Sequence, residues 1–122
     1  MKLHPSVAAG RNSITGYGDG YVLVNGARHD ANLIVLPDSI LPWSAASFEA
    51  LRAEDFAALA ALDLEVVLLG TGAALRFPRP QLTRALVEAK IGLEVMDMHA
   101  ACRTYNILMA EERRVAVALL LR

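Results

Sequence analysis

The chain has 122 residues, 55% of them hydrophobic, so it is long enough to fold as one domain without a disulfide or a structural metal. Its 12 Lys and Arg residues nearly balance 13 Asp and Glu residues, and a net charge of -1 argues against nucleic acid as a partner. The single cysteine cannot form an intramolecular disulfide, which favours a reducing compartment. We therefore expect one domain spanning residues 1–122.

The ends of the chain predict neither export nor membrane anchoring. Residues 1–12 contain an early proline and no continuous apolar core, so we expect a loose lead-in rather than a signal peptide. The longest apolar run, Val115 to Leu121, has seven residues, whereas a membrane-spanning helix needs about 20. We expect a cytoplasmic domain without a transmembrane segment.

The first part of the chain predicts a small antiparallel β-meander. Two extended segments, Ile14–Gly18 and Tyr21–Val24, are followed by Asp19-Gly20 and Asn25-Gly26. Both dipeptides suit type I′ hairpins, because Gly tolerates a positive φ and Asn or Asp comes close. A third strand is expected from about Ala27.

From residue 33 onward, short apolar runs alternate with amphipathic segments. The expected strands are 33–36, 64–69, 93–96 and 115–121, and the expected helices are 53–61, 80–90 and 98–110. This alternation predicts an α/β fold, with a largely parallel mixed sheet covered by about three helices. The last strand is apolar at every position, which predicts an interior strand.

The second helix and the loop before the first carry further signals. Pro80 opens the helix over 80–90, Leu82, Leu86 and Ala89 are expected to face the core, and Gly92 is expected to cap its end.

The only tryptophan, Trp43, lies in an expected loop that also holds Pro37 and Pro42. Its side chain either covers one end of the core or forms an exposed contact for a partner protein.

The segment from Glu94 to Asn106 concentrates the side chains that enzymes use as acids, bases and nucleophiles. Asp97 follows a strand and precedes a helix, where its carboxylate can accept hydrogen bonds from the first helical turn. The apolar positions Ala101, Tyr105, Leu108 and Met109 form a core-facing stripe, and His99, Cys102, Arg103 and Asn106 lie on a neighbouring face.

This polar face allows two interpretations. Cys102 and His99 could form a thiolate–imidazole pair, oriented by Asn106 or Asp97. However, reactive cysteines usually lie in the first helical turn, and Cys102 comes about one turn later, which favours a buried structural thiol. In that interpretation Arg103 pairs with a carboxylate, Asp97 or Glu94, and Tyr105 and Asn106 satisfy buried backbone groups.

Two expected strand ends could line one crevice, since ligands of such folds bind beyond the carboxyl ends of parallel strands. The candidate ligand residues are Gly70, Thr71, Gly72, Asp97, His99, Cys102 and Arg103. The Gly-Thr-Gly sequence lacks the spacing of a dinucleotide-binding loop, and although Arg76 and Arg79 follow it, a tight turn is favoured over an anion site. The scattered His4, His29 and His99 predict no metal site, and no cofactor is expected.

Three sequence features together resemble a known family. They are the Gly-Thr-Gly after a strand, the pattern EVMDxxAACRTYNxLxxExR from residue 94, and the closing VAxALL. They are similar to the NADH dehydrogenase (complex I) assembly factor 3 family and its bacterial homologues of unknown function, over about Ile14 to Leu121. The resemblance implies an α/β fold with a mixed sheet and a hairpin insertion. It carries over no catalytic residues, and relatives commonly have Thr where this chain has Met98.

The resemblance also implies a protein partner, because the mitochondrial relatives act as assembly factors and bind another assembly factor. Our first hypothesis is a non-enzymatic protein-binding or assembly module in the bacterial cytoplasm. The alternative is a small-molecule binder or enzyme that uses the crevice at the strand ends. A homodimer is compatible with either hypothesis, since symmetric dimers are common.

Overall fold

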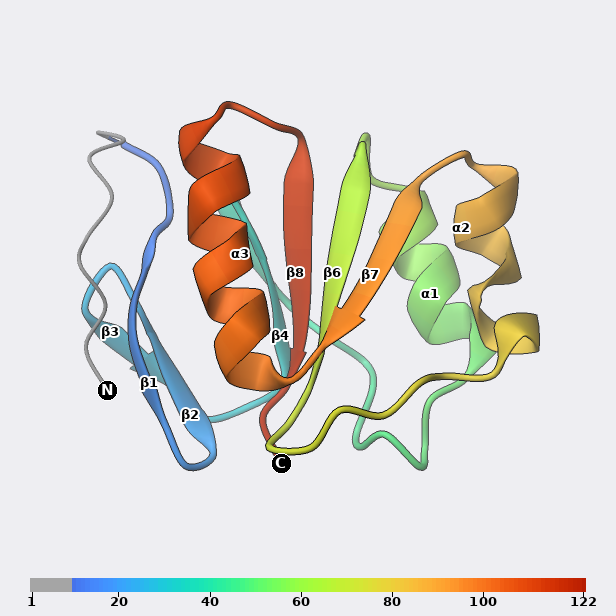
Figure 1. Cartoon of the computed structure of the whole chain (residues 1–122), viewed down its shortest axis with the longest axis horizontal. Helices are drawn as coiled ribbons and strands as arrows, with labels where there is room; N and C mark the ends of the chain where they lie inside the picture. The colour runs from blue at the N-terminus through green and yellow to red at the C-terminus, as the bar shows by residue number, and fades with distance from the viewer. Residues whose placement is uncertain (1–9) are drawn as a thin grey trace.

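The computed structural model describes residues 10–122, which form two β-sheets and a set of helices (Figure 1). The strands are β1 (Ile14–Gly18), β2 (Tyr21–Val24), β3 (Ala27–His29), β4 (Leu33–Leu36), β5 (Ser39–Pro42), β6 (Val66–Thr71), β7 (Gly92–Met96) and β8 (Val115–Leu120). The helices are α1 (Ala53–Ala60), the 3₁₀ helix η1 (Pro80–Thr83), α2 (Arg84–Glu88) and α3 (Met98–Ala110).

The larger sheet has five strands in the order β5-β4-β8-β6-β7. Strands β8, β6 and β7 run parallel to one another, whereas β4 is antiparallel to both β8 and β5. The smaller sheet is an antiparallel meander, β1-β2-β3. The predicted α/β fold, with its mixed sheet, its helices and its N-terminal meander, is confirmed, and so is the interior position of the last strand.

The five-stranded sheet is covered on both faces. Helix α3 and the meander pack on one face, and α1 and α2 pack on the other (Figure 1). Side chains of β8 alternate between the two cores, as neighbouring residues of a strand must. Val115, Val117 and Leu119 belong to the α3 side, and Ala116, Ala118 and Leu120 to the α1 side. All six are fully buried.

One strand was not predicted. Residues 37–43 were expected to form a loop, but Ser39–Pro42 is strand β5, which forms a hairpin with β4 and places Ser39 opposite Leu36. Its side chains alternate between half-buried and exposed, and it ends in a proline, so it lacks the apolar run that marks the other strands of this sheet. Its pairing with β4 makes this segment a strand, and that pairing depends on the tertiary structure rather than on a local sequence pattern.

The segment over 80–90 differs from the predicted single helix. It begins as η1 at Pro80 and continues as the short helix α2, whose only buried side chain is Leu86. Ala89 is exposed, so its predicted place in the core is wrong. The predicted cap at Gly92 is also wrong, because Lys90 takes the positive φ of 60° that ends the helix and Gly92 is already in β7.

The expected loose lead-in falls partly outside the described residues, since residues 1–9 are not among them. Asn12 is not loose. Its backbone N–H donates to Pro37 O (2.8 Å), its side-chain Nδ2 donates to Leu36 O (2.9 Å), and its own carbonyl accepts from the Tyr105 hydroxyl (2.9 Å). These contacts join the start of the domain to the β4–β5 hairpin and to α3.

The meander is fixed on α3 by one buried amide. The Asn25-Gly26 turn has the two positive φ angles (51° and 84°) that a type I′ turn requires, whereas in Asp19-Gly20 only Gly20 has a positive φ (78°), so the type predicted for that turn is wrong. Asn106 of α3 then pairs with the backbone of Ile14 in β1: its Nδ2 donates to Ile14 O (2.8 Å) and its Oδ1 accepts from Ile14 N–H (2.9 Å). The role predicted for Asn106, satisfying buried backbone, is confirmed.

We predict that Asn106→Ala lowers the free energy of unfolding by about 3 kcal/mol, because it leaves a buried N–H and a buried C=O without partners. Urea unfolding measures the change. The adjacent Ile107→Ala is the matched control, since Ile107 is 59% exposed and such surface changes usually stay within about 0.5 kcal/mol. Equal stability of the Asn106 variant and the wild type would contradict the prediction.

Candidate functional site

The strand end at Gly70 is closed by α3. A Cβ atom added to Gly70 would lie 2.8 Å from Leu119 Cδ2, 3.2 Å from Ala101 Cβ and 3.3 Å from Met98 Cα. The helix therefore begins in direct contact with β6, and glycine permits this close approach. At this point the proposed crevice is filled by the protein itself.

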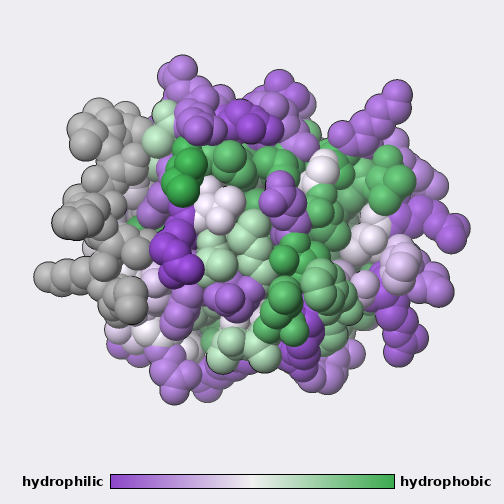
Figure 2. Space-filling view, in the orientation of Figure 1, coloured by the Kyte–Doolittle hydropathy of each residue, from purple (hydrophilic) through white to green (hydrophobic). Residues whose placement is uncertain are grey.

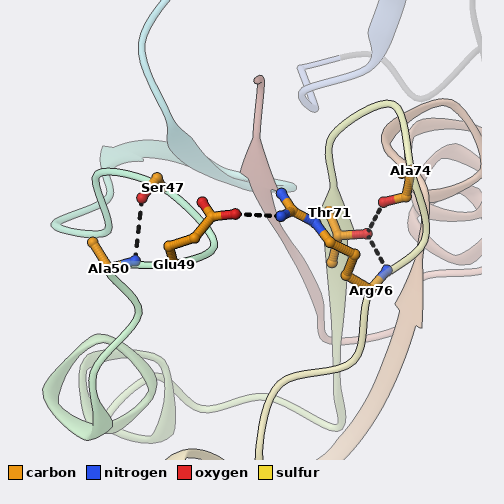
Figure 3. A network of polar contacts seen from close by, with 6 residues as sticks. All are labelled: Ser47, Glu49, Ala50, Thr71, Ala74 and Arg76. Carbon is orange, nitrogen blue, oxygen red and sulfur yellow. Dashed lines mark hydrogen bonds and ion pairs between the residues drawn. The ribbon is translucent and has the colours of Figure 1, made fainter.

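Thr71 and Gly72 build a tight turn, and Figure 3 shows the contacts of Thr71. The Thr71 hydroxyl donates to Ala74 O (2.7 Å) and accepts from the backbone N–H of Arg76 (3.1 Å). Gly72 has a φ of 77°, and its carbonyl accepts from Met98 N–H (2.8 Å). The hydrogen-bonding capacity of this sequence is therefore used within the fold, as expected for a structural turn.

Asp97 caps α3 as predicted, because its Oδ1 accepts from the backbone N–H of Ala100 (2.9 Å). Cys102 is fully buried one turn later, and burial raises the pKa of its thiol to about 12. His99 is exposed instead, with its ring stacked on Tyr17 at a centroid distance of 4.1 Å. No hydrogen bond joins Cys102 to His99 in the described part of the chain, so the helix does not present a thiolate–imidazole pair.

Arg103 has a different partner from the one predicted. Its Nη1 donates to the Tyr17 hydroxyl (3.0 Å) rather than to a carboxylate of Asp97 or Glu94. Together with the stacked ring of His99, this bond ties α3 to the buried Tyr17 of β1. His99 and Arg103, two of the predicted ligand residues on α3, thus contact the meander.

Trp43 is buried, with 6% of its surface exposed. Its Nε1 donates to Asp55 O (3.1 Å), and its ring packs edge-on against Phe56. It covers one end of the core on the α1 side, so the interpretation of Trp43 as an exposed partner contact is wrong.

Within residues 10–122, the His, Cys, Asp and Glu side chains do not gather into a group that could hold a metal ion. His4 lies outside the described residues. The helices of this part of the chain are each too short or too polar to cross a membrane.

Two exposed hydrophobic side chains lie close together in sequence on the loop after β6. Leu75 is 52% exposed and Phe77 is 70% exposed. We call the surface formed by Leu75, Phe77 and the adjoining groove the apolar loop surface; the groove is lined by Phe48, Glu49, Leu51, Arg76, Phe77, Pro78, Arg79 and Leu82. Figure 2 shows hydrophobic residues over β7 and the loop below it. Exposed apolar side chains beside a groove make this surface a candidate site of interaction.

Arg76 lies between the exposed Leu75 and Phe77 in the sequence, and its side chain holds this loop in place. The guanidinium lies over the ring of Phe48, 4.4 Å from the ring centroid, and forms an ion pair with Glu49 (Figure 3). A backbone hydrogen bond, and then Arg76, lower the pKa of the Glu49 carboxyl. With the Thr71 bond to its backbone, Arg76 is anchored at both ends. The loop therefore displays Leu75 and Phe77 from a fixed backbone.

Sequence reasoning missed the apolar loop surface. It treated residues 73–79 only as a place where Arg76 and Arg79 could meet an anion. The available signal was an aromatic residue, Phe77, between arginines and prolines with no helical or strand periodicity around it. Without such a periodicity, nothing in the sequence assigns Phe77 to the core.

Burial of Cys102 predicts a specific pH dependence. Between pH 9 and about 12 the unfolded chain loses a thiol proton that the folded chain keeps, so stability falls as the pH rises, by up to about 1.4 kcal/mol per pH unit. Cys102→Ala removes this contribution, so its free energy of unfolding should fall less steeply between pH 9 and 11. Burial also raises the pKa of Tyr105, but that effect is common to both chains and cancels.

Urea unfolding of wild type and variant at the two pH values provides the measurement. In addition, iodoacetamide should alkylate the wild-type thiol at neutral pH only after unfolding, since the thiolate is the nucleophile. Identical pH dependence of the two chains, or rapid alkylation of the native chain, would contradict the burial argument.

Known proteins are similar to this chain in sequence and in fold. An uncharacterized protein of Rhodobacter capsulatus is 34% identical over 114 residues, which are 92% of this chain and 86% of that protein. NADH dehydrogenase [ubiquinone] 1 alpha subcomplex assembly factor 3 of Bos taurus is 32% identical over 109 residues. The match covers 88% of this chain but only 59% of the length of the bovine protein.

A solved structure agrees with these relatives. The crystal structure of a protein from Bordetella parapertussis superposes with a TM-score of 0.86 at 40% identity, covering 93% of this chain and 98% of that one. The family model described as "Protein of unknown function (DUF498/DUF598)" matches residues 14–120, from the first residue of β1 to the last residue of β8. The predicted resemblance is therefore confirmed, and the chain belongs to the DUF498/DUF598 family, which is related to complex I assembly factor 3.

Proposed function

We propose that the chain is a non-enzymatic module that binds a partner protein during the assembly of a larger complex. The observation that carries this proposal is the 32% identity to the bovine assembly factor across 109 residues, which amount to nearly the whole domain. If the shared domain of the assembly factor binds another protein, this chain should bind a protein through the same domain. We infer that the partner is a protein of a respiratory or other membrane-associated assembly.

The chemistry of α3 supports a non-enzymatic role. The side chains that resemble a catalytic set have structural partners: Asp97 caps the helix, Asn106 bonds to β1 and Arg103 bonds to Tyr17. Cys102 is a buried neutral thiol at physiological pH. The residues of the alternative hypothesis do not surround an open crevice at Gly70.

The apolar loop surface supports the binding role. A large aromatic side chain that is 70% exposed, as Phe77 is, is unfavourable in water and favourable when a partner covers it. Because Arg76 already fixes the loop, little conformational entropy is lost when a partner binds. We therefore place the protein contact at Leu75 and Phe77.

The test is a pull-down of the tagged chain from its native host, with captured proteins quantified by mass spectrometry. The wild-type chain should recover a protein of a respiratory or membrane assembly, and the double variant Leu75→Ser, Phe77→Ser should recover at least tenfold less of it. Both side chains are exposed, so the variant should unfold at nearly the wild-type temperature.

The matched control is Ile40→Ser combined with Ile107→Ser, which removes exposed hydrophobic side chains from β5 and α3. This control should capture as much partner as the wild type. Recovery of no respiratory or membrane-assembly protein would contradict the proposed function, and equal losses in both double variants would contradict the assignment to the loop.

A further inference from the structure

Strand β7 is an edge of the five-stranded sheet, and one side of its backbone is unpaired. Gly92 N–H donates to Glu65 O (3.0 Å), so the backbone groups of Gly92 face β6. Alternate residues of a strand bond to the same neighbour, so Glu94 and Met96 also face β6, and the backbone groups of Leu93 and Val95 face outward. No hydrogen bond from residues 10–122 reaches those outward groups.

The two edges of this sheet differ in how they are protected. Proteins blunt exposed strand edges with prolines, with charged side chains, especially lysine, or with bulges, which oppose pairing with another strand. The β5 edge ends in Pro42 and follows Pro37, whereas β7 contains neither proline nor lysine. It is also parallel to β6 in unbroken register over five residue pairs. The β7 edge is thus left competent to accept a further strand.

The edge also adjoins the apolar loop surface. Met96 O, at the end of β7, lies 3.2 Å from the Thr71 hydroxyl that holds the loop. Leu93 and Val95 are half-buried on the α1 side of the sheet, where an added strand would extend the core. One extended segment can therefore contact β7 and continue onto Leu75 and Phe77.

Glu94 argues against a second copy of the chain as the added strand. In an antiparallel, two-fold symmetric pair that uses the outward groups of both Leu93 and Val95, Glu94 lies directly opposite its own copy. Like charges in directly opposed positions destabilise strand pairing. Glu94 is exposed and takes part in no ion pair within the described residues, so nothing neutralises it.

We propose, on the basis of the protein-binding function above, that β7 accepts an extended segment of the partner protein as an added edge strand. The segment places a lysine or arginine opposite Glu94 and apolar side chains beside Leu93 and Val95. Backbone hydrogen bonds supply affinity in this mode of recognition, and the facing side chains supply specificity. The free edge, the absence of proline and lysine from it, and the carboxylate of Glu94 without an ion-pair partner carry the proposal.

The test uses the protein recovered in the pull-down, purified and titrated against variants by calorimetry. Val95→Pro removes an outward N–H without removing a bond to β6, so it should fold and bind at least tenfold more weakly. Val95→Thr is the control, because it keeps the N–H and the side-chain shape, and it should bind within about threefold of wild type. Glu94→Lys should weaken binding at least tenfold, and Glu94→Gln should weaken it less.

Hydrogen exchange of the isolated chain gives a second readout that needs no partner. The amides of Leu93 and Val95 should exchange rapidly, those of Glu94 and Met96 slowly, and the partner should slow the first pair at least tenfold. Slow exchange at Leu93 and Val95 in the free monomer would overturn the proposal, because the edge would already be covered. A wild-type dimer that Val95→Pro dissociates would overturn it in favour of a second copy.

The outcome also separates this proposal from the function on which it rests. If the Leu75 and Phe77 variant loses the partner while folded Val95→Pro and Glu94→Lys chains bind like the wild type, the edge strand is wrong and the binding function stands. If the wild-type chain captures no assembly protein, both fail.

Discussion

The fold depends on one strand that is buried on both faces. Strand β8 lies in the middle of the five-stranded sheet, antiparallel to β4 and parallel to β6. Its alternate side chains enter two separate cores, the larger Val and Leu residues under α3 and two alanines with a leucine under α1. Neither layer of helices can bury its apolar face without this strand, so the two layers should unfold together.

The packing of the meander against α3 explains why this helix carries so many polar side chains. The meander packs over α3 and brings backbone groups out of water, and such groups must be hydrogen-bonded. Asn106, Tyr105 and Arg103 supply bonds to Ile14, Asn12 and Tyr17, each at least 86 residues away in the sequence. The polar stretch of α3 therefore connects distant parts of the fold, and the partner binding that we propose is assigned to the surface at β7 and the loop after β6.

The sequence predicted the features that local patterns encode. The positions of the two Asx-Gly turns, the Asp97 cap and the uniformly apolar last strand were all recognisable, and each holds in the structure. Features that depend on distant contacts were not recognisable: β5 is defined by its register with β4, and Arg103 pairs with a tyrosine 86 residues away. The helix cap at Lys90 was wrongly placed at Gly92, because a non-glycine residue adopts the left-handed conformation at Lys90. The apolar loop surface was missed because exposure has no sequence periodicity.

We infer that β8 makes the two layers one cooperative unit. Trp43 reports on the α1 side, and the amides of β1–β3 report on the α3 side. The most direct measurement is urea unfolding followed in parallel by Trp43 fluorescence and by nuclear magnetic resonance signals of the meander amides. We predict coincident transitions with one midpoint. A meander that unfolds at lower urea concentration than the region around Trp43 would contradict the account.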